Sequence, residues 1–254
     1  MTRATDKPPA ATGEAGDATP PPTPVTARDR AKADRRASLL AAAARLFAER
    51  GFDGVTLGDI GEAAGVSGPA VYRHVSSKQA LLGAILVDVS ERLLAGGRRV
   101  TESSRAGTTA EIAPDTPPSI LPAPLVAESP RSRAQPASAP NGPEDTDAVL
   151  RALVDFHVTF ALAEADVIRV QDRDLDRLSP ADRRTVRSLQ NAYVAVWTEA
   201  LVAANPDAET PAERRVRALA CFGLINSTPH SVRGVPAARV RPTLTRMALA
   251  ALTA

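Results

Sequence analysis

The stretch SGPAVYRH, residues 67–74, places several hydrogen-bonding side chains within two turns of a predicted helix. Val71 and Val75 have the spacing of an inward face. The residues left pointing outward are Ser67, Gly68, Ala70, Tyr72, Arg73 and His74. An exposed arginine can donate two parallel hydrogen bonds to O6 and N7 of guanine, while small residues allow close approach and a methyl contact with thymine. We therefore expect Arg73, helped by Ser67, to read base edges, and contacts with the DNA backbone to supply most of the affinity.

Local capping signals place this stretch on the second of two closely spaced helices. Thr56, with Asp59 three residues later, predicts the start of a short helix, and Gly65 ends it. The next helix opens two residues later, and Ser76 with Gln79 predicts a capping box for a longer helix. Helices this close must cross at a steep angle, so the second one projects outward and fits a DNA major groove. A helix N-terminus also attracts anions, which makes Thr56 a candidate phosphate ligand as well as a cap.

The same region carries a family resemblance. The run LLAAAARLFAERGFDGVTLGDIGEAAGVS is followed by VYRHVSSKQALL, and the segment from about Ala33 to Ala95 resembles the DNA-binding domain of TetR-family transcriptional regulators. This segment is about a quarter of the 254 residues. The resemblance implies that Tyr72 and Lys78 contact backbone phosphates and that His74 approaches one. Capping of the helix end would also explain His74.

A basic run, RDRAKADRR at residues 28–36, leads into the first helix, which is expected from about Ala33 to Arg50. Between residues 26 and 100 the chain has twelve basic and eight acidic side chains, the most basic balance along the sequence. This charge suits a polyanionic partner. Two interpretations of the run remain open: a solvated start of the helix, or an arm that touches DNA phosphates.

The chain beyond residue 147 is predicted to be helical throughout. A fourth helix is expected to run from Ser77 and to end at Gly96 and Gly97, and later helices are expected at about 148–164, 166–174, 179–204, 210–226 and 237–252. Side chains in these later helices mark a candidate ligand pocket, lined by Phe156, His157, Phe160, Asn191, Trp197, Phe222 and Asn226, with Tyr193 beside them. Ordinary core packing is the alternative explanation of such an aromatic stripe.

The resemblance implies that this helical region binds a small molecule and forms a dimer. In the family the last two long helices make the dimer interface, and the matching regions here are 214–224 and 241–252. The second region has apolar residues along one side, namely Leu244, Met247, Leu249 and Leu252. Packing inside one protomer is the alternative. The run GLINSTPH, residues 223–230, is similar to one in TetR subgroups that respond to acyl-CoA ligands, although helix capping would also explain Asn226.

The remaining segments and the composition limit the classes of function. Residues 1–27 and 101–147 hold most of the 22 prolines and are predicted to be a disordered tail and a disordered linker or insertion. Cys221 is the only cysteine, which excludes an intrachain disulfide, and the three histidines lie too far apart in sequence to indicate a metal site. No catalytic constellation or cofactor motif is recognisable, so enzymatic activity and a bound cofactor are not expected. The sequence also lacks a membrane-length apolar stretch and a signal core, which predicts a cytoplasmic protein.

These observations predict an all-α protein with two domains. Residues 28–97 form a three-helix helix-turn-helix DNA-binding domain, and residues 148–254 form a helical-bundle domain for ligand binding and dimerisation. The leading hypothesis is a homodimeric repressor that a small apolar or acyl-CoA-like effector releases from a pseudo-palindromic operator in double-stranded DNA. The alternative is a helical dimeric module that binds DNA or another partner without a ligand switch.

Overall fold

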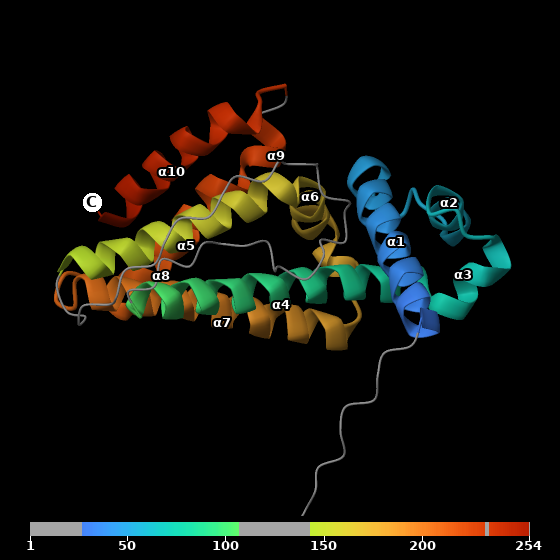
Figure 1. Ribbon diagram of the computed structural model, residues 1–254, viewed down its shortest axis with the longest axis horizontal. Coiled ribbons are helices and arrows are strands. Elements are labelled where there is room, and N and C mark those ends of the chain that lie inside the picture. Colours follow the sequence, from blue (N-terminus) through green and yellow to red (C-terminus); the bar gives the residue numbers. More distant parts are fainter. Residues whose placement is uncertain (1–26, 107–142, 232–233, 254) are drawn as a thin grey trace, which may run out of the picture.

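The computed structural model describes residues 27–106, 143–231 and 234–253, and every regular element in these ranges is a helix. The elements in chain order are α1 (Ala27–Arg50), α2 (Leu57–Ala63), α3 (Gly68–His74), α4 (Lys78–Arg105), α5 (Pro143–Ala163), α6 (Ala165–Asp174), the 3-10 helix η1 (Leu175–Arg177), α7 (Pro180–Ala204), α8 (Pro211–Asn226), α9 (Thr228–Ser231) and α10 (Ala237–Thr253). Figure 1 shows α1, α2 and α3 at one end of the molecule and α4 running from them along the remaining helices. The all-α prediction is confirmed.

The predicted disordered tail and linker fall mainly outside the described residues, at 1–26 and 107–142. At the margins the prediction was too wide, because residues 101–105 still belong to α4 and residues 143–147 already belong to α5. The first helix also begins earlier than expected, at Ala27 rather than near Ala33.

Several helix boundaries follow the predicted local signals. Thr56 and Asp59 form a reciprocal capping box at the start of α2, with the Asp59 N–H donating to Thr56 Oγ1 at 3.1 Å and the Thr56 N–H donating to Asp59 Oδ2 at 2.8 Å. Thr210 and Glu213 form the same arrangement at the start of α8. Gly65, which follows α2, has a φ of +65°, a left-handed conformation that glycine adopts without steric cost. These ends therefore depend on residues only a few positions apart.

The capping box predicted from Ser76 and Gln79 is wrong. The residue that caps α4 is Ser77, whose hydroxyl accepts a hydrogen bond from the Ala80 N–H at 3.0 Å. The Gln79 amide instead donates to the carbonyl oxygen of Arg177 in η1 at 2.9 Å. A contact with a distant part of the chain therefore takes the side chain that the local pattern had assigned to the cap.

The predicted end of the fourth helix at Gly96 and Gly97 is also wrong, because α4 continues through both glycines to Arg105. A Cβ atom built on Gly96 would lie 2.0 Å from Cζ of Phe156, and one built on Gly97 would lie 2.6 Å from Cε2 of Tyr193. The two glycines are therefore places where aromatic rings of α5 and α7 pack directly on the backbone of α4. Tertiary packing stabilises the helix across residues that would weaken it in isolation.

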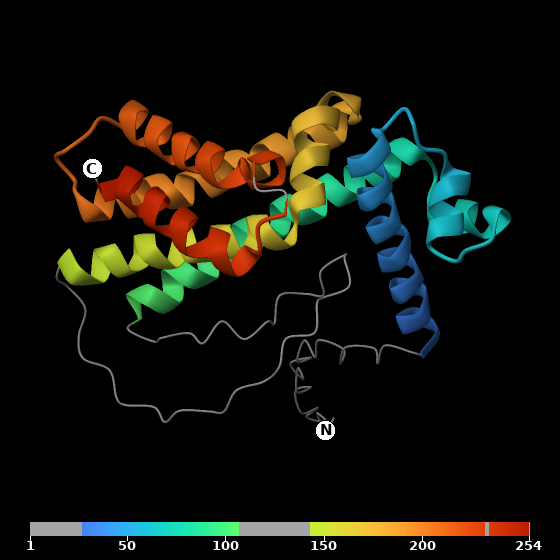
Figure 2. The same ribbon diagram turned by 90° about the horizontal axis from the view of Figure 1, so that it is seen from above.

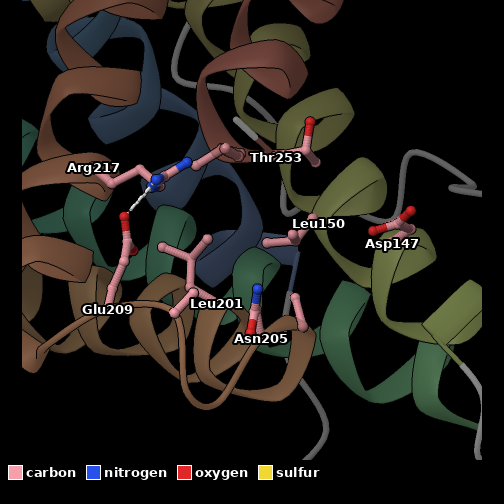
Figure 3. A pocket seen from close by; sticks show the side chains of 10 residues that line it. Asp147, Leu150, Leu201, Asn205, Glu209, Arg217 and Thr253 are labelled. Atoms are coloured by element: carbon pink, nitrogen blue, oxygen red, sulfur yellow. Dashed lines mark hydrogen bonds and ion pairs between the residues drawn. The ribbon is translucent and has the colours of Figure 1, made fainter.

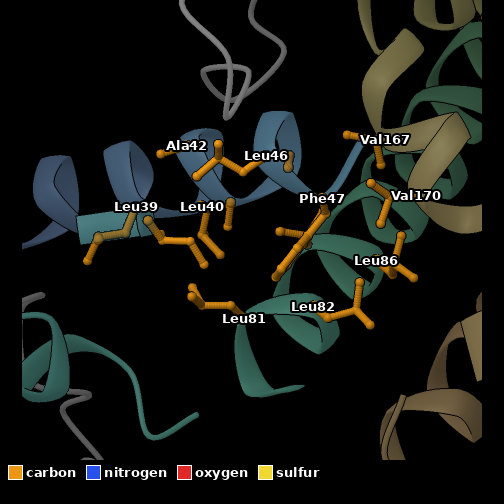
Figure 4. Close-up of a cluster of buried hydrophobic side chains, with 14 of the residues drawn as sticks. Leu39, Leu40, Ala42, Leu46, Phe47, Leu81, Leu82, Leu86, Val167 and Val170 are labelled. Carbon is orange, nitrogen blue, oxygen red and sulfur yellow. The ribbon is translucent and has the colours of Figure 1, made fainter. Parts of the chain in front are cut away.

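Two hydrophobic cores organise the molecule. The first is built from α1, the helix-turn-helix and the N-terminal half of α4, and Figure 4 shows Leu39, Leu40 and Phe47 of α1 packed over α4. The second lies among α5, α7, α8 and α10. The first core also includes Val167 and Val170 of α6, which are buried against the end of α1. The two groups of helices consequently share α4 and meet at α6.

Polar contacts reinforce the junction at α6. The Arg173 guanidinium donates to the carbonyl oxygen of Phe47 near the end of α1. Nη2 of Arg177, in η1, lies 2.5 Å from Oδ2 of Asp53 in the turn that follows α1. Deeper in the junction, Arg92 of α4 donates to Glu164, between α5 and α6, at 2.8 Å, and both side chains are buried.

No helix in the described ranges has the length and apolarity needed to span a bilayer.

Candidate functional site

The outer surface of the helix-turn-helix depends on a close approach of α2 and α3. A Cβ on Gly61 would lie 2.5 Å from Cγ2 of Val71 and 2.9 Å from the carbonyl oxygen of Val66. Only glycine lets α3 pack this tightly, with Val71 fully buried beneath it. We did not predict this role for Gly61, although a glycine inside the helical pattern was a visible signal for close backbone packing.

Burying Val71 leaves the opposite face of α3 in solvent. The Tyr72 side chain is 67% exposed, Arg73 is exposed, and His74 and Ala70 are partly buried. Ser67 is the exposed N-cap residue, and Gly68 is the first residue of the helix. Neither the Ser67 hydroxyl nor the Arg73 guanidinium makes a hydrogen bond or ion pair with the described part of the chain. These groups can therefore bind an external acceptor without breaking an internal contact.

Thr56 is more constrained than the residues of α3. Its hydroxyl accepts from the Asp59 N–H and donates to Asp59 Oδ2 at 2.7 Å. The hydrogen bond from Thr56 holds the pKa of the Asp59 carboxyl below its usual range. The hydroxyl proton is thus already used inside the capping box, and the phosphate contact of Thr56 remains a prediction.

Lys78 connects α4 to the turn between α1 and α2. Its ammonium group donates to the carbonyl oxygens of Phe52 at 2.7 Å and Val55 at 2.8 Å, and lies 4.3 Å from the centroid of the Phe52 ring. An ammonium group has three N–H donors, so one is left for a phosphate. Lys78 therefore joins the start of α4 to the turn between α1 and α2, and its phosphate contact remains a prediction.

A polar and aromatic cluster occupies the interior of the second core. It brings together His157 of α5, Tyr193 and Trp197 of α7, and Phe222 and Asn226 of α8. The His157 ring is stacked on Phe222, with 4.9 Å between centroids, and Trp197 meets both rings edge-on. Of the predicted ligand residues, His157, Trp197, Phe222 and Asn226 thus come together.

Hydrogen bonds define the tautomer of His157. Its Nε2 lies 3.1 Å from Oδ1 of Asn226, which only accepts, so Nε2 carries the proton. Nδ1 then accepts from the Tyr193 hydroxyl at 3.0 Å. Burial lowers the pKa of His157 to about 4 and raises the pKa of the Tyr193 phenol. The imidazole is therefore neutral at physiological pH, and the cluster carries no net charge.

One donor in the cluster is poorly paired. Nε1 of Trp197 is buried and makes no hydrogen bond of regular geometry within the described part of the chain, although it favours the ionised form of the neighbouring Tyr193 phenol and so opposes part of the rise in the pKa of that group. A buried N–H without an acceptor is unfavourable by about 1–3 kcal/mol. An oxygen of a bound molecule would remove this cost, so the indole marks a position suited to a hydrogen-bond acceptor.

The other predicted ligand residues lie elsewhere. Phe156 packs on Gly96 of α4, and Phe160 packs on the first core beneath the guanidinium of Arg92. Asn191 is exposed on α7, where its amide oxygen accepts from Arg215 at 2.9 Å. These three residues lie on the same helices as members of the cluster, but their side chains point to other neighbours.

The rings of the cluster are in direct contact, with centroids between 4.9 Å and 6.2 Å apart. A hollow of about 200 Å³ lies at the far end of the second group of helices, and Figure 3 shows it between Leu150, Leu201 and the ion pair of Glu209 with Arg217. None of the predicted ligand residues lines this hollow. A molecule that binds within the cluster would have to displace its aromatic rings, which would shift α5, α7 and α8 relative to one another.

Comparisons with known proteins cover both halves of the chain. Residues 39–85 match the model for bacterial regulatory proteins of the tetR family, and residues 143–230 match that for a tetracyclin repressor-like C-terminal domain. The transcriptional repressor KstR2 of Rhodococcus jostii (strain RHA1) is 39% identical over 85 residues, which cover 34% of this chain and 40% of KstR2. The transcriptional activator FasR of Mycolicibacterium smegmatis is 37% identical over 71 residues, 28% of this chain and 32% of FasR. These alignments span less than half the length of either curated relative.

The similarity in fold extends much further than the similarity in sequence. The structure of the ketosteroid transcriptional regulator KstR2 of Mycobacterium tuberculosis superimposes with a TM-score of 0.60 at 18% identity. That superposition covers 85% of this chain and 93% of the KstR2 chain. At this identity the likeness concerns the fold alone.

Proposed function

Because the chain belongs to the TetR family of bacterial transcriptional regulators, we propose that it is a homodimeric repressor whose binding to a pseudo-palindromic operator is relieved by a small ligand. DNA binding and transcriptional regulation follow from the family, whose members are regulators and not enzymes. Repression, the dimer and the ligand are the parts that we propose. One relative is a named repressor and another a named activator, so the direction of regulation requires its own test.

The observation that carries the DNA-binding part is the free outer face of α3. Tyr72 and Arg73 are exposed and make no hydrogen bond or ion pair with described residues. We assign Arg73 to base reading, with Ser67, Gly68 and Ala70 allowing close approach. Tyr72, His74, Lys78 and Thr56 are assigned to backbone phosphates.

Exposed apolar residues on α8 and α10 support the proposed dimer. These two helices pack against each other, and their outer faces expose Val216 (66%), Leu219 (45%) and Met247 (48%). Leu244 and Leu252 are buried inside the protomer, so they belong to its own core rather than to an interface. Two-fold symmetry would place the two DNA half-sites roughly 34–36 Å apart, one helical turn.

The interior cluster supports a ligand with an apolar body and a hydrogen-bond acceptor. Phe222 and Trp197 provide flat apolar surfaces, and the buried Trp197 N–H, which makes no hydrogen bond of regular geometry, provides a donor. An acyl-CoA-like molecule meets this description through its thioester carbonyl and acyl chain. Entry of such a group would separate His157 from Tyr193 or Asn226 and move the helices that carry them, and α6 connects this movement to α1.

The proposal is tested by selecting fragments of the source genome with the purified full chain, followed by footprinting of the enriched fragments. We expect a pseudo-palindrome, and we expect a subset of added acyl-CoA thioesters to release it. Arg73→Ala is the matched variant for base reading: its enriched sites should lose preference at one position of each half-site, worth about 1–3 kcal/mol. Enrichment of no sequence by the folded, ligand-free protein would favour the interaction module without a switch.

A further inference from the structure

Three basic side chains on the first turns of α1 are exposed and unpaired with respect to the residues that the structure describes. Residues 30–38 are exposed along their whole length. Lys32, Arg35 and Arg36 make no ion pair or hydrogen bond with any residue that the structure describes. Figure 2 shows these turns projecting from the N-terminal group of helices. Packing does not stabilise this part of α1, so its basic side chains are available to a partner.

The register of α1 gives these side chains a common direction. At 100° per residue, Lys32, Arg35 and Arg36 fall within an arc of roughly 100° that also contains Leu39 and Leu46. Both leucines are buried in the first core. The basic stripe therefore continues the inward side of α1 beyond the point where the core ends.

The same register separates the charges on this part of the helix. Arg30 and Asp34 lie on the opposite side of α1, about 140–180° from Leu39. Where the stripe meets the core, Leu39 belongs to the same buried cluster as Leu81 of α4 and Val71 of α3. Leu81 lies one turn from the start of α4, and only residues 75–77 separate α4 from the end of α3. The stripe thus extends the side of α1 that packs on the core shared with α3 and the start of α4.

We propose that Lys32, Arg35 and Arg36 form a second DNA-contacting surface, which binds backbone phosphates next to the base pairs contacted by α3. Guanidinium groups pair with phosphate oxygens through two parallel hydrogen bonds, and an ammonium adds a point charge. These contacts carry no base specificity, so they raise affinity for all sequences and lengthen the protected region. This inference rests on the proposed DNA-binding function and adds residues that lie before the region matched to the family at 39–85.

The salt dependence of binding tests the proposal. The probe is a duplex that carries the selected operator with about ten further base pairs on each side, one helical turn. The variant Lys32→Gln/Arg35→Gln/Arg36→Gln keeps helix propensity nearly unchanged. Each lost phosphate contact should reduce the steepness of log K against log salt by about 0.9. Loss of three contacts from each protomer of a dimer should therefore reduce it by about 5. Affinity for a random duplex should fall by a similar factor, and the footprint should shorten at its outer edges.

Two further variants make the result specific to the stripe. Arg30→Gln removes the same charge from the opposite side of α1 and should change the slope much less. Lys32→Arg/Arg35→Lys/Arg36→Lys keeps all three charges and should retain the wild-type slope. Circular dichroism should show unchanged helix content in each protein.

The outcomes separate this inference from the function on which it rests. If the wild type binds its operator and the triple Gln variant retains the same slope and footprint, the stripe is only a solvated helix start and the inference is wrong. Equal losses in Arg30→Gln and the triple variant, counted per charge, would also contradict it, because the effect would then be net charge alone. If the wild type enriches no sequence, the proposed function itself fails.

Discussion

The two tyrosines of the chain have opposite surroundings. Tyr72 on α3 is 67% exposed, whereas Tyr193 on α7 is 4% exposed and donates to His157. The proposed DNA-contacting surface consists of side chains that a local pair of helices, α2 and α3, leaves uncovered. The interior cluster consists of side chains that three separate helices bring together. One region can bind a partner without internal rearrangement, and the other must give up contacts before it can bind anything.

This difference has an energetic consequence. Side chains on the outer face of α3 contribute little to the free energy of unfolding, so changes there should affect binding alone. His157, Tyr193 and Asn226 stabilise the fold only while their polar atoms remain paired. The same cluster is therefore both a part of the core and the place where we propose that a ligand acts.

The largest expected contrast is between Trp197→Ala and Tyr72→Ala. Trp197 is fully buried, and removing its side chain should lower the free energy of unfolding by about 3–5 kcal/mol. Tyr72→Ala should leave stability within about 0.5 kcal/mol of wild type and weaken binding to specific and random DNA alike. Urea unfolding and DNA titration of both variants measure the contrast. A large loss of stability in Tyr72→Ala would mean that the outer face of α3 is not free.

The next effect is a pH dependence that belongs to the interior alone. Burial lowers the pKa of His157 to about 4, below its usual value of 6.5, so the unfolded chain binds a proton that the folded chain excludes. The stabilisation is therefore complete above pH 6.5 and is lost as the pH falls towards 4. Between about pH 7.5 and 5 it should amount to about 2 kcal/mol.

Urea unfolding at these two pH values checks this expectation. The free energy of unfolding of His157→Phe should differ much less between the two pH values, because phenylalanine has no group that titrates between them. His230→Gln is the matched control, because it removes an exposed histidine, whose Nε2 lies 3.2 Å from Oδ2 of Asp172. A pH dependence that survived in His157→Phe would assign the effect to another group.

Glycine positions give a smaller contrast. Gly97→Ala forces a methyl group against Tyr193 and should cost about 1–2 kcal/mol, the strain exceeding the gain in helix propensity. Gly58→Ala in α2 is the control, because its new Cβ would meet only Thr56 Oγ1 at an ordinary 3.5 Å. Gly58→Ala should be neutral or stabilising by up to about 1 kcal/mol. Thermal unfolding of the two variants distinguishes close packing from a simple helix interruption.

The smallest predicted effect concerns Lys78, which makes hydrogen bonds inside the protein and is also proposed to contact a DNA phosphate. Lys78→Met removes two hydrogen bonds to the carbonyl oxygens of Phe52 and Val55 and should lower stability by about 1 kcal/mol without DNA present. The control Arg99→Met, at an exposed position on α4, should leave the free energy of unfolding unchanged. Weaker DNA binding by Lys78→Met at unchanged stability would instead assign Lys78 entirely to phosphate contact.

Local spacing was sufficient to predict the helix-turn-helix and most helix starts. The capping boxes at Thr56 and Thr210 form between residues three positions apart, so the sequence contains both partners of each interaction. Ser76 with Gln79 and the glycines at 96 and 97 followed the same local rules and were misassigned. In both cases a residue distant in sequence, Arg177 or Tyr193, changed the role of the local signal.

The sequence by itself determined the helical class, the helix-turn-helix and the outward residues of α3, because these depend on hydrogen bonds and periodicities within about one helical turn. Only the tertiary structure decided that His157, Tyr193, Trp197, Phe222 and Asn226 meet, and that Asn191 does not join them. Such a cluster forms where α5, α7 and α8 bury their faces together. Which residues of a long helix reach that shared interior depends on how the helices cross, and no short-range pattern records the crossing.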